Sequence, residues 1–253
     1  MHTFAVVHVP RGVQVPPHVE DLLRSTQPVD LAFRSEGHLH WSSDDRTAQF
    51  GGWHAGGEHL GRGSYHDVRP SGLTAFAGSL WVDSQPWEQW VPWASQLADR
   101  LDAVHGPPAA GVRTVLSRSN GCFSMVRLGP DGRGAIGSDA LGLHLLYTAT
   151  VGDLTVVSNR AALAARIVAP AGTRPARDVE SAAWMAFVGS VFDDRSTFRD
   201  VRVLPVGATV EFSPTDGPEV NPGDSTPWLD RSARLDPLDP ASYGAAVEDL
   251  RAN

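Results

Sequence analysis

Residues 38–66 contain five histidines that could ligate a metal, namely His38, His40, His54, His59 and His66. His38 and His40 alternate, so on a strand they would share one face. Glu58 and Asp67 lie nearby, and zinc accepts both imidazole and carboxylate ligands. No pair has the spacing H-E-x-x-H of a helical zinc site, and the surrounding segment is rich in glycine. A divergent metal enzyme therefore remains a minor hypothesis, and no metal ligand is assigned.

Two other motifs that could carry chemistry are interpreted as structural. Gly132, Gly134 and Gly137 spell G-x-G-x-x-G, but a dinucleotide site needs a preceding strand and a following helix. Here the glycines lie across a turn and an outgoing strand, which favours a structural role. Cys122 lies in an apolar run with nothing evident to lower its pKa, which indicates a buried structural thiol. The chain contains neither the nucleophile elbow G-x-S-x-G nor a P-loop.

The composition excludes several classes of protein. The chain has 253 residues, of which 42% are hydrophobic, so it can bury a sizeable core in one large or two small domains. Its net charge is -8 and it has no basic block, which argues against nucleic-acid binding. One cysteine excludes an intramolecular disulfide framework and a cysteine-based zinc site. No apolar run approaches the roughly 20 residues that span a bilayer, and the N-terminus lacks the features of a signal peptide, so we expect a cytoplasmic protein.

Apolar runs separated by polar turns predict antiparallel strands along most of the chain. They are expected at residues 3–9, 31–34, 38–41, 47–53, 73–82, 122–128, 134–138, 144–150 and 154–159. Residues 52–70 are expected to form a loop, and 201–213 to form a last hairpin that turns at Pro205–Gly207.

Helices are predicted to cover these strands. The longest is expected over 87–106, because Leu97, Leu101 and Val104 recur at helical spacing and Gly106 precedes a proline. Shorter helices are expected over 160–167 and 179–190, and a helix or bend over 111–119. Trp87, Trp90 and Trp93 are interpreted as packing residues, with stacking on a ligand as the alternative. Many antiparallel strands followed by covering helices indicate an α+β fold.

The composition changes after residue 213, which predicts a boundary between domains. Residues 1–213 are expected to form one domain, and the Pro/Gly/Asp-rich residues 214–238 a linker. Asp239 and Pro240 then offer an N-cap and first-turn pair for an amphipathic helix over 239–253, which we expect to begin a second domain.

The order of the fragments in residues 119–164 resembles the N-terminal domain of glutamine-dependent asparagine synthetases. That family runs G-x-F-A, a hairpin, R-D-x-x-G-x-R-P-L-Y, a second hairpin and A-S-E-x-K-A-L. This chain reads Gly121-Cys122-Phe123-Ser124, then SDALGLHLLY over 138–147, then VSNRAAL over 157–163. Downstream, STFRDVRVLPVGATVEF over 196–212 is similar to T-x-F-x-x-I-x-x-L-P-P-G-x-x-L. Order and spacing carry the resemblance, because no single fragment is unique.

The resemblance implies a four-layer α/β/β/α sandwich of two antiparallel sheets, of the N-terminal-nucleophile hydrolase type. It implies that Asp139 and Gly142 form a turn, and that Leu145, Leu146 and Tyr147 belong to the core. The family hydrolyses glutamine with a cysteine that follows the initiator methionine, whose freed amine is the general base. His2 occupies that position here, and an imidazole cannot repeat the thioester chemistry of a thiolate.

The family's N-G-E-I-Y-N segment, which holds glutamine and forms the oxyanion hole, corresponds to Ala77–Val82. Ala77 replaces the amide donor, Gly78 is retained, and Ser79 replaces the carboxylate that grips the substrate ammonium. The R-G-P-D segment of the family has no clear counterpart. We therefore expect no catalytic residue, and a vestigial pocket lined by His2, Ala77, Gly78 and Ser79.

β-Lactam synthetases and lasso-peptide cyclases resemble this chain in carrying such a domain without its cysteine. In those relatives a C-terminal domain uses ATP and Mg²⁺ to activate a carboxylate, and its S-G-G-x-D-S motif is absent here. The leading hypothesis is an inactive glutaminase-like scaffold for an asparagine-synthase-like, amide-forming synthetase domain in the same or another chain. We expect no cofactor on this chain, with ATP and Mg²⁺ bound by that partner. The alternative is a stand-alone module that binds a small molecule or peptide in the vestigial pocket.

Overall fold

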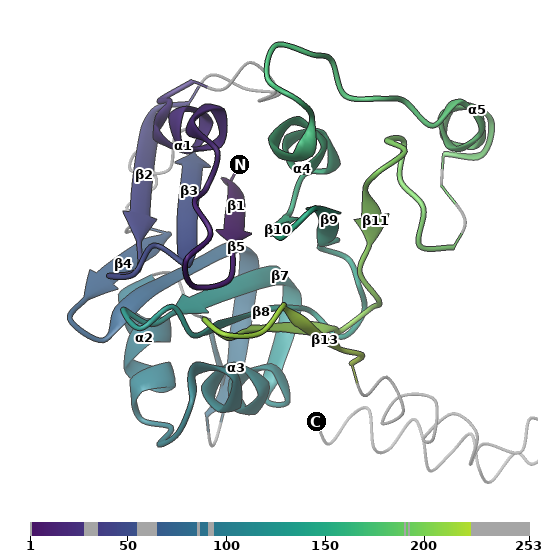
Figure 1. Ribbon diagram of the computed structural model, residues 1–253. Helices are drawn as coiled ribbons and strands as arrows, with labels where there is room; N and C mark the ends of the chain where they lie inside the picture. The colour runs from purple at the N-terminus through teal and green to yellow at the C-terminus, as the bar shows by residue number, and fades with distance from the viewer. Residues whose placement is uncertain are drawn as a thin grey trace, which may run out of the picture.

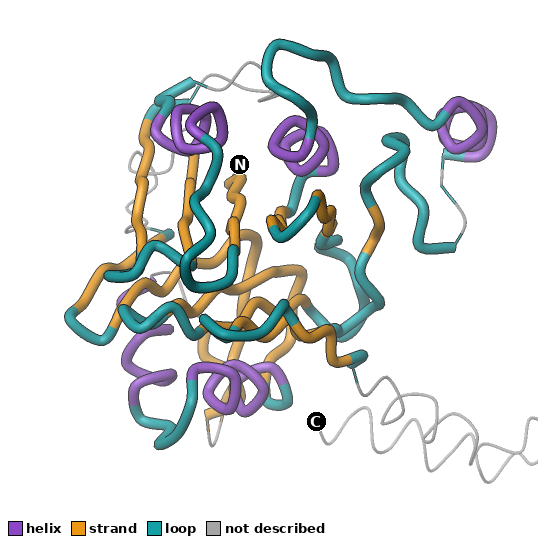
Figure 2. The backbone as a smooth tube through the Cα atoms, viewed as in Figure 1, coloured by secondary structure: helices purple, strands orange, loops and turns teal. Residues whose placement is uncertain are grey.

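The computed structural model describes residues 2–27, 35–54, 65–84, 87–90, 94–189, 191 and 193–223. These residues form two antiparallel sheets (Figures 1 and 2). The first sheet has the spatial order β11 (Arg202–Val203), β9 (Tyr147–Val151), β10 (Leu154–Ser158), β1 (His2–His8), β3 (Ala48–His54) and β2 (Gly37–Ser42). The second has the order β13 (Glu219–Asn221), β12 (Thr209–Phe212), β8 (Gly134–Ser138), β7 (Ser119–Leu128), β5 (Gly72–Ser84) and β4 (His66–Arg69), with β6 (Trp87–Trp90) paired to β5.

Helices cover the outer face of each sheet (Figure 1). Helices α1 (Pro17–Arg24) and α4 (Ala161–Val168) share a hydrophobic cluster with the first sheet, and α2 (Ala94–Asp102) and α3 (Pro108–Leu116) share one with the second. A third cluster fills the space between the sheets. The predicted α+β class and its four-layer α/β/β/α sandwich are therefore confirmed.

Strand β1 lies inside the first sheet, and this position explains the composition of the segment HTFAVVH over residues 2–8. All seven of its residues are buried, because helices cover one of its faces and the second sheet covers the other. Phe4 and Val6 point inward between the sheets, whereas Ala5 and Val7 point outward under α1 and α4. A strand that is buried on both faces is apolar almost throughout rather than alternating.

Residues 87–106 do not form the single helix that their leucine spacing predicts. Trp87–Trp90 forms strand β6 beside β5, and helix α2 begins only at Ala94. Pro92 lies between the two elements and lacks the amide proton that a helix interior needs. The leucine pattern correctly predicts a helix only in the second half of residues 87–106, where Leu97 and Leu101 are buried. The packing assigned to Trp87, Trp90 and Trp93 concerns side chains outside the described part.

The predicted hairpin over 201–213 is also wrong. Strand β11 pairs with β9 in the first sheet, whereas β12 pairs with β8 in the second. The turn at Pro205–Gly207 therefore carries the chain from one sheet to the other. Two strands that flank a tight turn look the same in sequence whether they pair together or with other partners.

Several smaller expectations also change. Residues 52–70 include the end of β3 and strand β4, so they are not wholly a loop. Within the predicted linker, Glu219–Asn221 forms the edge strand β13 on β12. Helix α1, which begins with Pro17 in its first turn and buries Val19 and Leu23, had not been predicted. The strand predicted at 31–34 and the helix predicted at 239–253 lie outside the described residues.

Helix α5 (Val179–Val188) stands away from both sheets (Figure 1). Asp178 caps its first turn by accepting a hydrogen bond from the amide of Ser181, and Gly189 ends it with a φ of 76°. Its large apolar side chains are exposed, and Phe187 is 89% accessible. None of the helices that the structure describes is long and apolar enough to cross a membrane.

Candidate functional site

His2 lies at the first position of β1 with its side chain on the inner face of the sheet, in the same alternation as Phe4 and Val6. It is directly opposite His54 in the β1–β3 register. The two imidazoles are stacked, with ring centroids 5.7 Å apart and 14° between the planes. His2 is only 6% exposed, and neither of its ring nitrogens has a hydrogen-bond partner.

The second sheet closes over His2 with an aromatic ring and a further histidine. The ring of Tyr65 lies 4.1 Å from that of His2, and the same tyrosine packs on Phe76 at 5.6 Å. His66 begins β4, and its ring lies 6.5 Å from that of His54. The imidazole of His144 is close enough to influence the charge of His2. We call His2, His54, His66 and His144 the histidine cluster.

Ala77, Gly78 and Ser79 lie together on β5, which contacts β1 across the space between the sheets. Ala77 is fully buried in the cluster that also holds Phe4 and Val6, whereas Ser79 is half-buried. Gly78 has a φ of +98°, and a Cβ there would clash with the carbonyl oxygen of Cys122 on β7. The positions that the resemblance assigns to a pocket are therefore on facing strands, and a methyl group stands where the family has an amide.

The turn after β8 is organised by the carboxylate of Asp139, as expected. The carboxylate accepts hydrogen bonds from the amides of Leu141 at 3.1 Å, Leu143 at 3.0 Å and His144 at 2.8 Å. Gly142 adopts a φ of +63° there. Asp139 is thus a structural residue that fixes the backbone of His144.

The core residues predicted beside this turn are confirmed only in part. Leu146 is buried and Tyr147 is partly buried, but Leu145 is 41% exposed and does not belong to the core. Leu145 lies just before β9, where alternation along the extended chain turns its side chain outward.

Burial disfavours a positive charge on three members of the histidine cluster, which are His2, His66 and His144. The pKa of His2 is well below its ordinary value, first because of burial and then because His54 and His66 are close. Burial also lowers the pKa of His66 and that of His144. An uncharged imidazole is a weak nucleophile without a base to activate it.

Cys122 is the one thiol of the chain, and it lies half-buried on β7. Burial raises its pKa, and the negative charge of Asp139 raises it further. The thiolate is the reactive form of cysteine, so this environment makes Cys122 an inert thiol. Its predicted structural role agrees with these surroundings.

Of the histidines considered as metal ligands, His54 and His66 approach each other in the histidine cluster, whereas His38 lies on the other face of the first sheet. His38 points to the outer face of the first sheet, where its ring contacts Trp53 and its Nε2 lies 2.7 Å from the carbonyl of Leu23. His54 follows Trp53 and points to the opposite, inner face. Among the described residues, no three histidine, cysteine or acidic side chains are arranged to hold a metal ion. His59 lies outside the described residues.

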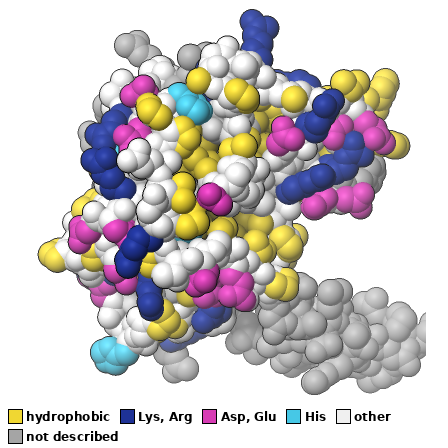
Figure 3. Space-filling view, viewed as in Figure 1, with side chains coloured by type: hydrophobic (Ala, Val, Ile, Leu, Met, Phe, Trp, Pro, Cys, Tyr) yellow, Lys and Arg dark blue, Asp and Glu magenta, His cyan; other side chains and the backbone are white. Residues whose placement is uncertain are grey.

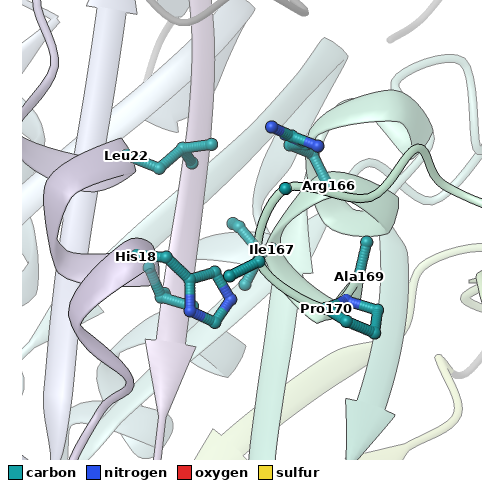
Figure 4. A pocket seen from close by; sticks show the side chains of 9 residues that line it. His18, Leu22, Arg166, Ile167, Ala169 and Pro170 are labelled. Atoms are coloured by element: carbon teal, nitrogen blue, oxygen red, sulfur yellow. The ribbon is translucent and has the colours of Figure 1, made fainter.

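The G-x-G-x-x-G pattern has the structural role expected of it. Gly132 occupies a turn with a φ of +82°, and Gly134 and Gly137 lie in β8, which leads to another strand-forming segment and not to a helix. A small surface pocket elsewhere, of about 60 Å³, lies between α1 and the end of α4 (Figure 4). His18, Leu22 and Arg166 contribute to its wall. Its volume matches roughly two water molecules, which is far below that of a substrate pocket.

Sequence reasoning found the strands of this site but missed three of its side chains. Tyr65, Ser124 and His144 had not been singled out. Ser124 pairs with Ala77 in the β5–β7 register, and its buried hydroxyl has no hydrogen-bond partner. Ser124 and His144 stand in the fragments that carry the resemblance, but only the pairing of β5 with β7 and the turn after β8 bring them to this site.

Comparisons with known proteins give similarity to solved structures alone. No family model matches the chain, and no curated protein matches it. Glutamine phosphoribosylpyrophosphate amidotransferase from B. subtilis, complexed with ADP and GMP, is 13% identical over 88% of this chain, with a TM-score of 0.48. A structure of the allosteric regulatory enzyme of purine biosynthesis is 14% identical over 88% of this chain, with a TM-score of 0.49. In both cases the match covers 49% of the other chain, so this chain spans about half the length of the structures it matches.

Proposed function

We propose that this chain is a glutaminase-like domain that does not hydrolyse glutamine. We place it in an asparagine-synthase-related, ATP-dependent, amide-bond-forming protein, where it serves as a scaffold. The observation that carries the proposal is the position of His2. It begins a central strand and points into the space between two sheets, where the family that the sequence resembles has its nucleophilic cysteine.

Among the residues that the structure describes, the surroundings of His2 lack the groups that acyl transfer needs. The reaction requires an activated nucleophile and donors aimed at the developing oxyanion. His2 is buried without a hydrogen-bonded base, and the methyl group of Ala77 cannot donate a hydrogen bond. Removing one oxyanion donor alone costs a factor of about 10²–10³ in rate. Loss of the nucleophile as well removes the route.

The described residues near these strands also give no support for recognition of an amino-acid substrate. The ammonium group of an amino acid needs a carboxylate partner, and Ser79 supplies only a hydroxyl. Asp139 is the acidic residue that influences both Cys122 and His144, but its oxygens already accept three backbone amides. The sandwich is intact although its site lacks these groups, and this combination fits a remaining function as a scaffold.

The exposed apolar surface of α5 supports the proposal that this chain binds a partner protein. A helix that is apolar on all sides is normally covered by other protein, yet the exposed residues of this helix include Val179, Trp184 and Phe187. Figure 3 shows yellow side chains over α5, bordered by charged ones. We propose that the partner is a synthetase domain in the same or another chain. It would bind ATP and Mg²⁺ and would determine whether the product is asparagine, a β-lactam or a lasso-peptide macrolactam.

A glutaminase assay tests the proposal. The purified chain is incubated with glutamine at high protein concentration, beside His2→Ala and Cys122→Ser variants as matched controls. We expect the same glutamate release from all three proteins as from buffer. Release by the unchanged chain that His2→Ala or Cys122→Ser abolishes would overturn the proposed inactivity.

The scaffold role needs a second measurement. A tagged chain is compared with its Val179→Ser/Phe187→Ser variant for capture of an ATP-dependent synthetase from its native lysate. We expect the double variant to lose capture while its unfolding midpoint stays the same, because these side chains are 78% and 89% exposed. Equal capture by the two proteins would remove α5 from the interface.

A further inference from the structure

The histidine cluster connects the two sheets at one end of the sandwich. His2 and His54 belong to β1 and β3 of the first sheet, and His66 belongs to β4 of the second. The contact of His2 with Tyr65 and the approach of His54 to His66 are the ring contacts that cross between the sheets here. Closure of this end therefore depends on imidazoles lying against one another.

A proton on His2 would have no partner to stabilise it. Both ring nitrogens are buried without a hydrogen-bond acceptor, so an imidazolium would carry two unsatisfied N–H groups. The groups that influence the charge of His2 are His54, His66, His144 and the amino group of the chain, and all of them oppose a positive charge. Repulsion would therefore add to the cost of burying the charge.

The acidic groups near the cluster are already engaged. Asp67 follows His66 and is paired with Arg69 at 2.5 Å. Asp139 favours a charge on His144, but its oxygens hold three backbone amides. Two further groups disfavour a positive charge in the cluster. Arg160, at the start of α4, acts on His144, and His38, on β2, acts on His66.

We propose that the histidine cluster is an acid-sensitive joint between the two sheets. It is closed while the imidazoles are uncharged, and proton uptake opens the His2 end of the sandwich. The far end, where β8 pairs with β12, contains no member of the cluster, but His8 lies there with its ring 5.4 Å from that of Phe212 and its Nε2 2.8 Å from the carbonyl oxygen of Ser213. Burial also lowers the pKa of His8, so variants of the cluster are needed to assign opening to the His2 end. Such a joint would couple acidification to exposure of β1 and of the surface between the sheets.

The direction of the effect follows from the pKa shifts. Burial lowers the pKa values of His2, His66 and His144 in the closed state, whereas exposure returns them toward the ordinary value of 6.5. The open state therefore binds more protons below that pH. Each extra proton shifts the equilibrium toward the open state by about tenfold per pH unit until the closed-state pKa is reached.

Amide hydrogen exchange of the full chain at about pH 7 and about pH 5 tests the joint. After correction for intrinsic exchange rates, we expect opening of β1 and β4 to rise at least about tenfold at the lower pH. Opening of α2 and α3, which pack on the outer face of the second sheet, should stay the same. Unchanged protection of β1 and β4 in the unsubstituted chain would overturn the proposal.

Two variants assign the effect to the cluster. His2→Phe keeps a buried ring but cannot be protonated, so it should lose most of the pH-dependent opening. His105→Gln removes an exposed histidine between α2 and α3 and should behave like the unsubstituted chain. If His2→Phe does not fold, His144→Gln takes its place. Full pH dependence in the cluster variant, or its loss in His105→Gln, would refute the joint.

Discussion

The imidazoles of His2 and His54 stack across neighbouring strands, directly opposite each other in the register of β1 and β3. The resemblance to glutamine-hydrolysing enzymes points to position 2, and an imidazole stands at that position. A buried and uncharged imidazole lies among other imidazoles, with Tyr65 against it. This arrangement occupies the space between the sheets at that end and supplies no activated nucleophile.

Substitution of Gly78 by alanine should destabilise the chain strongly. The residue has a φ of +98°, and a Cβ would clash with the carbonyl oxygen of Cys122, so β5 and β7 would have to separate locally. Gly12→Ala is the matched control, because its φ is +89° but nothing lies within 4 Å of the added carbon. We expect about 1 kcal/mol of destabilisation for Gly12→Ala and more than about 3 kcal/mol for Gly78→Ala. Urea unfolding measures both, and equal losses would show that the clash has no effect.

Removal of the Asp139 carboxylate should loosen the turn before β9. Asp139 is only 2% exposed, and Asp139→Ala would remove the charged acceptor of three partly buried backbone amides. We expect a loss of roughly 2–4 kcal/mol in the free energy of unfolding. Asp153→Ala, in the exposed turn between β9 and β10, should cost under about 0.5 kcal/mol. A loss as small as this control in Asp139→Ala would contradict the structural role.

The ion pair of Arg127 and Asp102 should contribute more to stability than the surface pairs. The Arg127 side chain is only 8% exposed, and it donates hydrogen bonds to Asp102 and to Thr74 Oγ1. Asp102→Asn would leave a buried guanidinium without its counterion, which we expect to cost roughly 2 kcal/mol. Asp131→Asn breaks an exposed pair with Arg133 and should have almost no effect. Chemical unfolding of the two variants at neutral pH decides between these outcomes.

Asp45 should make the free energy of unfolding depend on pH at values well below the pH range of histidine protonation. Burial opposes its charge, but hydrogen bonds from Thr47, Arg11 and Ser43 outweigh burial and lower its pKa to about 2. A carboxylate with a depressed pKa stabilises the fold above its unfolded value of about 4 and loses that contribution as the pH falls toward 2. Unfolding measured from about pH 4 to about pH 2 should show a steeper decline in the unsubstituted chain than in Asp45→Asn. Parallel curves would contradict this assignment.

The layers of the fold could be predicted from the sequence, whereas the partners of several strands could not. Alternating and doubly buried runs such as HTFAVVH carry their own signal. The destination of β12 depends on β8, which is distant in sequence, and the turn at Pro205–Gly207 gives no sign that it joins two sheets. The tryptophans of β6 show the same limit, because a helical spacing of apolar residues also fits a strand followed by a helix.

The sequence predicted which positions belong to the site but not how their side chains are arranged in space. The resemblance identified His2 and the three residues at 77–79, and the structure places them on the contacting strands β1 and β5. It could not identify Tyr65, which precedes β4, or His144, which lies in the turn after β8. Both depend on long-range packing, which a local pattern does not encode.

The central claim is that the residues described by the structure supply no activated nucleophile in the space between the two sheets. Intact-mass measurement after incubation with an electrophilic glutamine analogue tests this claim most directly, because an activated side chain would be trapped covalently. We predict an unchanged mass at neutral pH for the purified chain. A single stoichiometric adduct, mapped to His2 or Cys122 and competed by glutamine, would contradict the account.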